Sequence, residues 1–371
     1  MPVGARSFPF IRRIPGIRVR IAQIAPLYEA VPPQLYGGTE RVVAHLADAL
    51  VELGHDVTLF ASSGAGTRAE VVAMRDQAIR LDPSPLKSDL AAHLAMLHEV
   101  RLRADQFDVL HFHIDMIHFP FFEHCANRTV TTLHGRLDIK DLPGAYRRWP
   151  QYPLVSISND QRKPLLFASW ISTVYHGLPS DLHRFSPRSD GYLAFVGRIA
   201  PEKRPDRAID VARRAGRLLK IAAKVDPVDA TYFRDVIKPM LAGPHTDFIG
   251  EISDAEKNKL LGGAAALLFP IDWPEPFGLV MIEAMACGTP VIAWNRGSVS
   301  EVVEHGVTGF VVNSDEEAVE ALQKVESLDR HRVRRIFERR FSAKVMARNY
   351  VDIYSRLAQS GGNRGQRLQS V

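Results

Sequence analysis

Two short apolar segments separated by a loop and a helical stretch constrain the fold of this chain more than any other feature. Residues 264–269 (AAALLF) and 290–294 (PVIAW) are short and apolar and are bounded by turn residues, which is typical of buried strands. Residues 278–287 (GLVMIEAMAC), which lie between them, have the length and composition of a helix. A strand, a loop, a helix and a second strand form the repeating unit of a parallel sheet. The stretch therefore predicts an α/β fold with doubly wound sheets.

The loop and the helix start of this unit carry groups suited to a ligand with phosphates and hydroxyls. Gly278 stands where the helix is expected to begin. A glycine there lets a ligand approach the N–H groups of the first turn, which favour an anion. Glu275 and Glu283 flank this position with seven residues between them, and carboxylates accept hydrogen bonds from hydroxyls. The spacing predicts that phosphates lie on the helix start while the two carboxylates bind hydroxyls.

The whole segment EPFGLVMIEAMACGTPVIA resembles the donor-sugar motif of the retaining glycosyltransferases of family 4, which have the two-domain GT-B fold. This resemblance implies that Glu275 binds sugar hydroxyls and is catalytic, and that Glu283 binds the nucleotide ribose. It also implies that the backbone around Phe277, Gly278 and Leu279 holds the diphosphate of the donor. The alternative is that Glu283 faces solvent and Glu275 caps a helix.

Length and composition indicate two soluble domains. A chain of 371 residues is long for one hydrophobic core, and 46% hydrophobic with 24% charged residues is typical of a globular enzyme. It has no apolar run of about 18 residues that could span a bilayer. The start of the chain has arginines on both sides of a very short apolar piece, unlike a secretory signal. Cys125 and Cys287 are the only cysteines, so we expect reduced thiols and a cytoplasmic location.

The positive charge of the chain is concentrated at its two ends. The net charge is +5, and residues 330–348 alone contain seven arginines. Basic ends of this kind could contact an anionic membrane peripherally, at its inner face, although a run of charges is usually a solvated surface. Nucleic acid is not an expected partner, because no recognition motif accompanies the charge.

The first nucleotide-fold half begins with a strand at residues 19–25 and a helix at residues 39–53. The loop between them reads YGGTE and contains no GxGxxG, so a nicotinamide cofactor is not favoured. This loop is similar to the N-domain loop of family 4. The resemblance implies that Gly37 and Gly38 border the donor phosphates and that Tyr36 lies near the acceptor. An ordinary turn with two glycines is the alternative.

Histidines follow two further strands of this half. His113 and Asp115 follow the strand at residues 107–112, where ligands collect in open parallel sheets, and we expect them to contact the acceptor. A zinc pair is an alternative for this His-x-His sequence, although no third ligand follows at a suitable spacing. His134 follows the strand at residues 129–133. In family 4 a histidine at the matching place faces the reacting sugar, so the resemblance makes His134 a catalytic candidate; a core histidine is the alternative.

The second half opens with a strand at residues 192–196 that runs into the loop GRIAPEKRP. An arginine and a lysine five residues apart before a helix can place two cations on a diphosphate. The loop resembles the phosphate loop of family 4, which implies that Arg198 and Lys203 bind the leaving diphosphate, are catalytic and replace a divalent metal. A solvated basic loop is the alternative. Ile249 ends a later strand where the family contacts the base, and Lys224 is a less secure phosphate contact.

The domain limits follow from the change of pattern near a polar, proline-containing stretch before residue 192. The predicted parts are an extension at 1–17, an N-terminal domain at 18–185, a C-terminal sugar-nucleotide domain at 186–341, a helix at 342–358 that crosses back onto the N-terminal domain, and a disordered tail at 359–371.

Together these patterns predict a retaining, metal-independent glycosyltransferase without a cofactor, which moves a hexose from a nucleotide diphosphate sugar to a hydroxyl acceptor. UDP-glucose is the favoured donor and GDP-mannose the next. No enzyme nucleophile is evident, so the resemblance implies front-face attack assisted by the departing phosphate. The alternatives are a sugar-nucleotide 2-epimerase of the same fold and a non-catalytic sugar-binding protein. Neither the acceptor nor the oligomeric state follows from the sequence.

Overall fold

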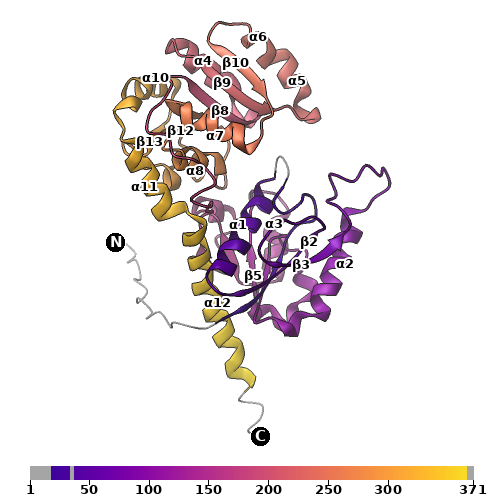
Figure 1. The fold of residues 1–371 in the computed structure, drawn as a ribbon. Helices are drawn as coiled ribbons and strands as arrows, with labels where there is room; N and C mark the ends of the chain where they lie inside the picture. The colour runs from indigo at the N-terminus through magenta and orange to yellow at the C-terminus, as the bar shows by residue number, and fades with distance from the viewer. Residues whose placement is uncertain (1–17, 34–36, 366–371) are drawn as a thin grey trace.

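The computed structural model describes residues 18–33 and 37–365, with side chains described through residue 359. The predicted extension at 1–17 and the acceptor candidate Tyr36 lie outside these residues. Figure 1 shows two α/β units, one above the other, with the last helix running from the upper unit down along the lower one. The two doubly wound units and the returning helix confirm the predicted fold class.

All strands of the N-terminal domain run parallel, in the order β3-β2-β1-β4-β5-β6-β7. They are β1 (Arg20–Ile24), β2 (Asp56–Ser62), β3 (Glu70–Arg75), β4 (Val109–Phe112), β5 (Thr129–Thr132), β6 (Leu154–Ser156) and β7 (Trp170–Thr173). A parallel sheet needs a cover on both faces, and here helices provide it. They are α1 (Gly38–Glu52), α2 (Asp89–Leu102), α3 (Leu142–Arg148) and α12 (Ala343–Gly365).

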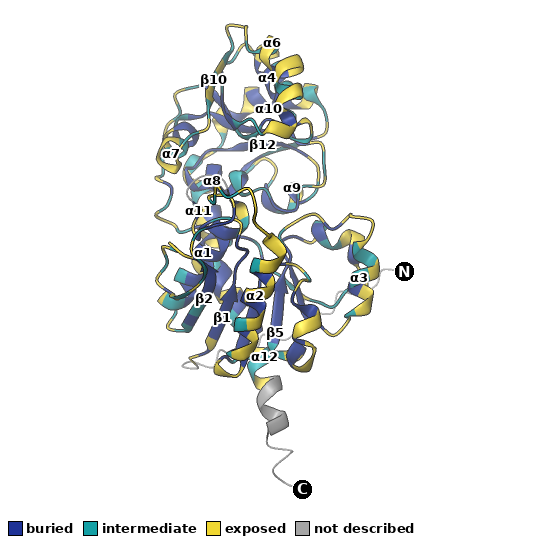
Figure 2. Ribbon diagram, turned by 90° about the vertical axis from the view of Figure 1, so that its right-hand side faces the viewer, coloured by how far each residue is buried: buried dark blue, intermediate teal, exposed yellow. Residues whose placement is uncertain are grey.

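Alternate side chains of the N-terminal strands feed two separate cores. On β1, Ile21 packs into the core shared with α1 and α12, and Ala22 into the core shared with α2. The returning helix contributes Met346, Tyr350 and Tyr354 to the first core, and all three are buried. Figure 2 shows the strands as buried blue ribbons between helices whose outer sides are exposed. The last helix of the chain is therefore part of the N-terminal domain.

The C-terminal domain repeats this plan with a six-stranded parallel sheet in the order β10-β9-β8-β11-β12-β13. Its strands are β8 (Leu193–Arg198), β9 (Leu219–Lys224), β10 (Thr246–Gly250), β11 (Ala266–Phe269), β12 (Val291–Trp294) and β13 (Gly309–Val312). Its helices are α4 (Pro205–Arg214), α5 (Ala230–Tyr232), α6 (Lys238–Met240), α7 (Asp254–Gly263), α8 (Leu279–Ala286), α9 (Val299–Val302), α10 (Asp315–Lys324) and α11 (Arg330–Phe341). Helices α7, α8 and α11 share one core, and α4 and α10 share the other.

The chain passes between the two domains at two points that lie side by side. Leu178 donates its backbone N–H to the carbonyl of Phe341 at 2.9 Å, and Ala343 donates to the carbonyl of Leu178 at 2.8 Å. Gly177 fits there because it lacks a side chain: a Cβ at this position would lie 2.5 Å from the carbonyl oxygen of Ser342. The outgoing and the returning segments therefore form one short paired crossing.

Two features of the sequence prediction were wrong. Helix α12 continues to Gly365, so residues 359–365 are helical where a disordered tail was expected; the rest of that tail lies outside the described residues. The strands β3 and β13 were not predicted. Both lie at an edge of a sheet, where a strand has one neighbour and needs no long apolar run.

Across the described part of the chain, we find no helix that is both long enough and apolar enough to cross a membrane.

Candidate active site

A pocket of about 350 Å³ lies between the two domains. It forms where the carboxyl ends of strands from both sheets meet, the usual ligand position in open parallel sheets. His134 follows β5 in the N-terminal domain, while Arg198 and Lys224 end β8 and β9 in the C-terminal domain. The pocket brings together ten of the predicted site residues: Gly37, Gly38, His134, Arg198, Lys203, Glu275, Phe277, Gly278, Leu279 and Glu283.

The start of α8 forms one wall of the pocket and requires a glycine. Gly278 has a φ of 78°, in the left-handed region, and a Cβ there would lie 2.8 Å from Cε of Met281 and 3.0 Å from Cζ of Phe269. Leu279 at the first helical position lines the pocket, and a Cβ on Gly38 of the N-terminal domain would lie 3.6 Å from it. The amides of this first turn therefore face the cleft at the point where the two domains approach each other.

Lys203 and Glu275, predicted to bind different parts of the donor, contact each other. The ammonium group forms an ion pair with Oε2 of Glu275. The indole N–H of Trp273 donates to the same oxygen at 3.1 Å, and Nζ of Lys203 lies 4.8 Å from the centre of the indole ring. Glu275 is thus oriented by two donors on one oxygen and does not cap a helix.

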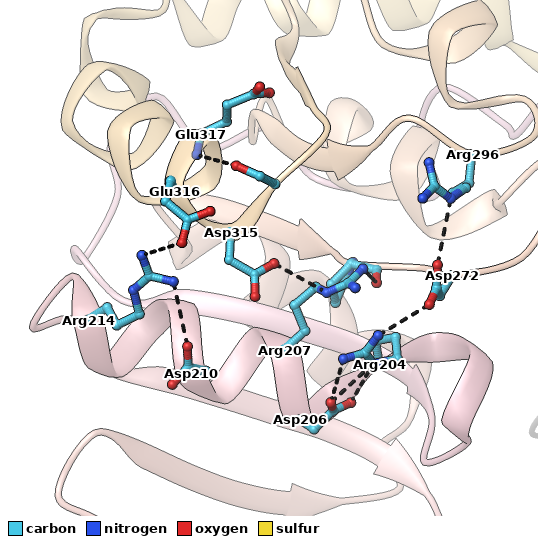
Figure 3. Close-up of polar contacts among 12 residues, drawn as sticks. Arg204, Asp206, Arg207, Asp210, Arg214, Asp272, Arg296, Asp315, Glu316 and Glu317 are labelled. Atoms are coloured by element: carbon cyan, nitrogen blue, oxygen red, sulfur yellow. Dashed lines mark hydrogen bonds and ion pairs between the residues drawn. The ribbon is translucent and has the colours of Figure 1, made fainter.

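Ionic contacts tie the loop of Lys203 to the loop of Glu275. Asp272 donates its backbone N–H to the carbonyl of Glu202 at 2.9 Å. Its carboxylate accepts from Arg204 at 3.2 Å and lies 3.6 Å from Arg296. Figure 3 shows Arg204 between Asp206 and Asp272, with Arg296 on the far side of Asp272. The two loops therefore form one rigid edge of the pocket.

Arg198 lies among three carboxylates. Its guanidinium is 2.5 Å from Glu202, 3.4 Å from Asp229 and 3.6 Å from Asp226, and Lys224 pairs with Asp226 at 3.0 Å. Burial raises the pKa of Asp229, although the charge of Arg198 opposes this rise. A diphosphate bound to Arg198 would compete with these acids for the guanidinium.

Glu283 is buried and belongs to a chain of charges that crosses the cleft. It accepts from Lys257 at 2.7 Å; Lys257 lies 3.1 Å from Asp254, and Asp254 accepts from Arg41 on α1 at 2.6 Å. Burial opposes ionisation of Glu283, but the nearby Lys257 outweighs it and holds the pKa of this carboxyl below its usual value. The alternative that Glu283 faces solvent is wrong.

His134 lies at the pocket wall of the N-terminal domain. Its Nε2 is 2.9 Å from Nδ1 of His113, and its ring stacks on that of His176 with centres 5.2 Å apart. Burial lowers the pKa of His134 to about 3, so the ring is neutral at ordinary pH.

Three predicted contacts are absent from the pocket lining of the described residues. His113 is buried behind His134, and Asp115 is exposed with a φ of 50°. Ile249 is 42% exposed at a register shift in β10, and Glu251 and Ile252 line the pocket instead. A bulge of this kind shifts the alternation of side chains between the two faces of the strand, so Ile249 points away from the pocket. The sequence alone did not reveal the bulge.

The sequence analysis also missed four polar or aromatic residues at this site: Arg41, Asp254, Lys257 and Trp273. Arg41 follows the YGGTE loop, and Trp273 stands two residues before Glu275, so proximity to a motif could have indicated both. Asp254 and Lys257 belong to no motif and reach Glu283 only because α7 lies beside α8.

The pocket can bind an anion beside a group rich in hydroxyls. Among the residues that the structure describes, its lining contains a helix start, the neutral His134, five cationic side chains and four carboxylates; the cations are Arg41, Arg198, Lys203, Lys224 and Lys257, and the acids are Glu251, Asp254, Glu275 and Glu283. Within the described residues, no group of three or more His, Cys, Asp or Glu side chains could hold a metal ion.

Comparisons with known proteins agree with this geometry. The family model Glycosyltransferase Family 4 matches residues 36–165, and the model Glycosyl transferases group 1 matches residues 183–340. The glycogen synthase of Mycobacterium tuberculosis is 28% identical over 330 residues, which cover 75% of this chain and 79% of that protein.

Solved structures share the fold. AviGT4, a glycosyltransferase involved in avilamycin A biosynthesis, superposes with a TM-score of 0.72 at 23% identity, over 92% of this chain and 98% of that one. HepE of Anabaena, in complex with UDP and glucose, superposes with a TM-score of 0.69 at 18% identity, over 91% and 100% of the two chains. The two matching models, one on each side of the cleft, show that the chain belongs to glycosyltransferase family 4 and is a glycosyltransferase, and the solved structures show that its fold is GT-B.

Proposed function

We propose that this enzyme transfers a hexose from a nucleotide diphosphate sugar to a hydroxyl acceptor, with retention of the anomeric configuration and without a metal ion. The observation that carries this proposal is the single pocket in which Arg198, Lys203 and the start of α8 lie beside Glu275 and Glu283. Cations and helix amides suit the diphosphate, and the carboxylates suit the hydroxyls of sugar and ribose.

The expected chemistry is dominated by electrostatic stabilisation of the leaving diphosphate. Negative charge develops on that group as its bond to the sugar breaks, and preorganised cations in a site shielded from water stabilise such charge strongly. Arg198 and Lys203 would give up part of their contacts with Glu202 and Glu275 to bind it. Glu275 is already paired with Lys203 and Trp273, which supports a role in binding hydroxyls over a role as nucleophile. We therefore expect front-face attack by the acceptor hydroxyl, with its proton passing to the departing phosphate oxygen.

UDP-glucose is the favoured donor, with GDP-mannose next. A UDP and a glucose occupy the related HepE structure, and the glycogen synthase relative is named for a glucose polymer. The acceptor would enter from the N-terminal side, past His134 and the loop of Gly37 and Gly38.

A panel of sugar nucleotides tests this function. We expect one donor to raise the melting temperature of the enzyme and to be hydrolysed slowly without acceptor. With a hydroxyl acceptor, we expect transfer of the sugar, and NMR of the product should show that the anomeric configuration is retained. Activity should persist in excess EDTA, because the cations of the protein neutralise the diphosphate. A donor converted to its 2-epimer without acceptor would establish the epimerase instead, binding without turnover would establish a sugar-binding protein, and activity lost in EDTA and restored by manganese would contradict metal independence.

We also infer that any peripheral contact with an anionic membrane uses three exposed arginines of α11. The other arginines of this helix are structural: Arg330 donates to the carbonyl of Ser186, Arg334 to that of Ala286, and Arg340 pairs with Glu304. In contrast, Arg332, Arg335 and Arg339 are exposed and line a second pocket on this helix. Sedimentation with phosphatidylglycerol vesicles should capture the enzyme, and the triple alanine variant should remain in solution. Equal behaviour of both proteins, or capture by neutral vesicles, would contradict the inference.

A further inference from the structure

A chain of buried hydrogen bonds runs from the returning helix α12 to the pocket. The hydroxyl of Tyr354 lies 3.0 Å from Nε2 of Gln23 on β1. Oε1 of the same amide lies 2.7 Å from Nε2 of His113, and Nδ1 of His113 lies 2.9 Å from Nε2 of His134. Four residues from four separate segments thus connect a helix of the N-terminal core to the wall of the active site.

The pocket end of this chain has an unused polar atom. Gln23, His113 and Tyr354 are buried, and the contacts above use both ends of the amide and both nitrogens of His113. In contrast, Nδ1 of His134 is buried and has no hydrogen-bond partner among the residues that the structure describes. A buried polar atom without a partner costs free energy, so its retention at a pocket wall points to a ligand group that completes it.

The amide of Gln23 sets the direction of every bond in this chain. Its oxygen can only accept, so His113 must carry its proton on Nε2. A neutral imidazole then has a bare Nδ1, which accepts from Nε2–H of His134. This leaves Nδ1 of His134 without a proton. Burial keeps both rings neutral, since it lowers the pKa of His113 well below its usual value and that of His134 to about 3.

Tyr354 is the hydrogen-bond partner of the amide nitrogen of Gln23. Its hydroxyl accepts from Nε2 of Gln23 and lies 2.7 Å from Nδ1 of His111, to which it can donate. Nε2 of His111 in turn donates to Thr132 at 2.8 Å. If the amide were reversed, each of these bonds would reverse too, and His134 would present a donor to the pocket.

We propose that Gln23, His113 and Tyr354 are positioning residues that hold His134 as its Nε2–H tautomer. The bare Nδ1 then accepts a hydrogen bond from a hydroxyl of the ligand in the cleft. His176, stacked on the ring of His134, holds its plane. That this hydroxyl belongs to the hexose or to its acceptor rests on the proposed transfer reaction. The tautomer of His134 does not depend on that reaction.

The tautomer can be measured without any substrate. Protein labelled with ¹⁵N-histidine and assigned with a His134→Gln variant should show, near neutral pH, the NMR pattern of an imidazole protonated at Nε2 only. Protonation at Nδ1 would overturn the proposal, whether or not the enzyme transfers a sugar. This separates a failure of the tautomer from a failure of the proposed function.

Two buried tyrosines of α12 provide a matched pair for kinetics. Tyr354→Phe removes the hydrogen-bond partner of the Gln23 amide nitrogen, whereas Tyr350→Phe removes a hydrogen bond of 2.8 Å to Thr132 and leaves the contacts of Gln23 in place. We expect Tyr354→Phe to lower kcat by roughly ten-fold, the scale of one hydrogen bond, with a mixed tautomer signal. Tyr350→Phe should keep the Nε2–H tautomer and nearly the parent kcat.

Gln23→Leu is the second variant, because it removes the amide without changing α12. It should shift the His134 signal and lower kcat with little change in KM for the donor. Parent tautomer and parent kcat in both Tyr354→Phe and Gln23→Leu would overturn the positioning role. If Tyr350→Phe and Tyr354→Phe lowered kcat equally and left the tautomer of His134 unchanged, the network would only stabilise the fold, and the positioning role would be wrong.

Discussion

Lys203 and Glu275 pair with each other in the pocket, and each can exchange this partner for a group of the donor. The ion pair keeps both charges satisfied in a partly buried place, and Trp273 fixes the carboxylate from a second side. The energetic cost of separating such a pair is offset if a diphosphate takes the lysine and sugar hydroxyls take the glutamate. The ion pair therefore holds both side chains in the pocket before the donor arrives, and the donor can replace each side chain's contact with one of its own.

The two cations should both be essential for transfer. Arg198→Ala and Lys203→Ala are each expected to lower kcat/KM by about a hundred-fold or more, the scale of losing a preorganised charge in a dry site. Lys238→Ala, an exposed cation of the same domain, is the control and should behave like the parent. Steady-state kinetics with the best donor give the comparison, and activity within a few fold of the parent in both site variants would refute the assignment.

The two glutamates should fail in different ways. Glu275→Gln should mainly lower kcat, because contacts near the reacting carbon strengthen as charge develops. Glu283→Gln should mainly raise the donor KM, because the ribose lies away from the chemistry and its binding is uniform. Measurement of both constants checks this, with thermal melts to exclude unfolding, since Gln would leave Lys257 paired only with Asp254. The opposite split would reverse the placement of sugar and ribose along the pocket.

At the scale of elements, α8 and the two loops before it determine the shape of the donor wall. The helix begins at a left-handed glycine, and its preceding loop is fixed by Arg204 and Arg296 through Asp272. A further close contact comes from the turn after β12: a Cβ on Gly297 would lie 2.3 Å from the carbonyl oxygen of Glu275. The loop can therefore move little without moving the whole wall.

Gly278→Ala should disturb this wall directly. An alanine at a φ of 78° is strained by about 1 to 2 kcal/mol, and its Cβ would also push Met281 and Phe269. We expect a lower melting temperature and a higher donor KM. Gly144→Ala in α3 is the matched control, since no atom lies within 4 Å of the added Cβ, and it should keep activity with equal or higher stability. A Gly278→Ala enzyme with the parent melting temperature and KM would show that the helix start is adaptable.

Much of this element structure could be predicted from the sequence, for identifiable reasons. Buried parallel strands such as residues 264–269 are continuous apolar runs, and α8 is bounded by a glycine on each side, so both were recognisable. The edge strands β3 and β13 were not, because their apolar runs, VVAM and FVV, are only four and three residues long. The link from Arg41 through Asp254 and Lys257 to Glu283 was not predictable either, because it depends on how two domains meet and no local pattern encodes that distance.

At the scale of the whole molecule, folding suppresses the positive charge of several buried histidines. Burial lowers the pKa of His134 to about 3 and that of His45 to about 4, and it holds the pKa values of His111, His118 and His176 well below the usual range. In the unfolded chain these rings titrate near the ordinary value of about 6.5. Folding therefore requires them to stay neutral.

Stability should fall steadily as the pH drops below about 6.5. In that range the unfolded chain binds protons that the native protein rejects, so each such histidine lowers the free energy of unfolding by about 1.4 kcal/mol per pH unit, down to its native pKa. Urea unfolding at a series of pH values from 7.5 to about 4.5 measures this slope. His45→Leu should reduce the slope of the free energy of unfolding against pH by the contribution of one histidine, about 1.4 kcal/mol per pH unit. A free energy of unfolding that stays level between about pH 7 and pH 5 would contradict the neutral state of these rings.

The paired crossing at Leu178 and Ser342 has a consequence for how this protein can be made. The N-terminal domain is synthesised before the C-terminal domain, yet Met346, Tyr350 and Tyr354 of its core leave the ribosome only after the whole C-terminal domain. Until they arrive, the apolar face of α1 and its strands has no cover, although the C-terminal domain between them is already complete in sequence. The N-terminal domain is thus translated first, but its core is completed last. A nascent chain exposes the apolar face of α1 and its strands while the whole second domain is synthesised. A gene cut after residue 185 would encode an N-terminal domain that lacks one side of its own core.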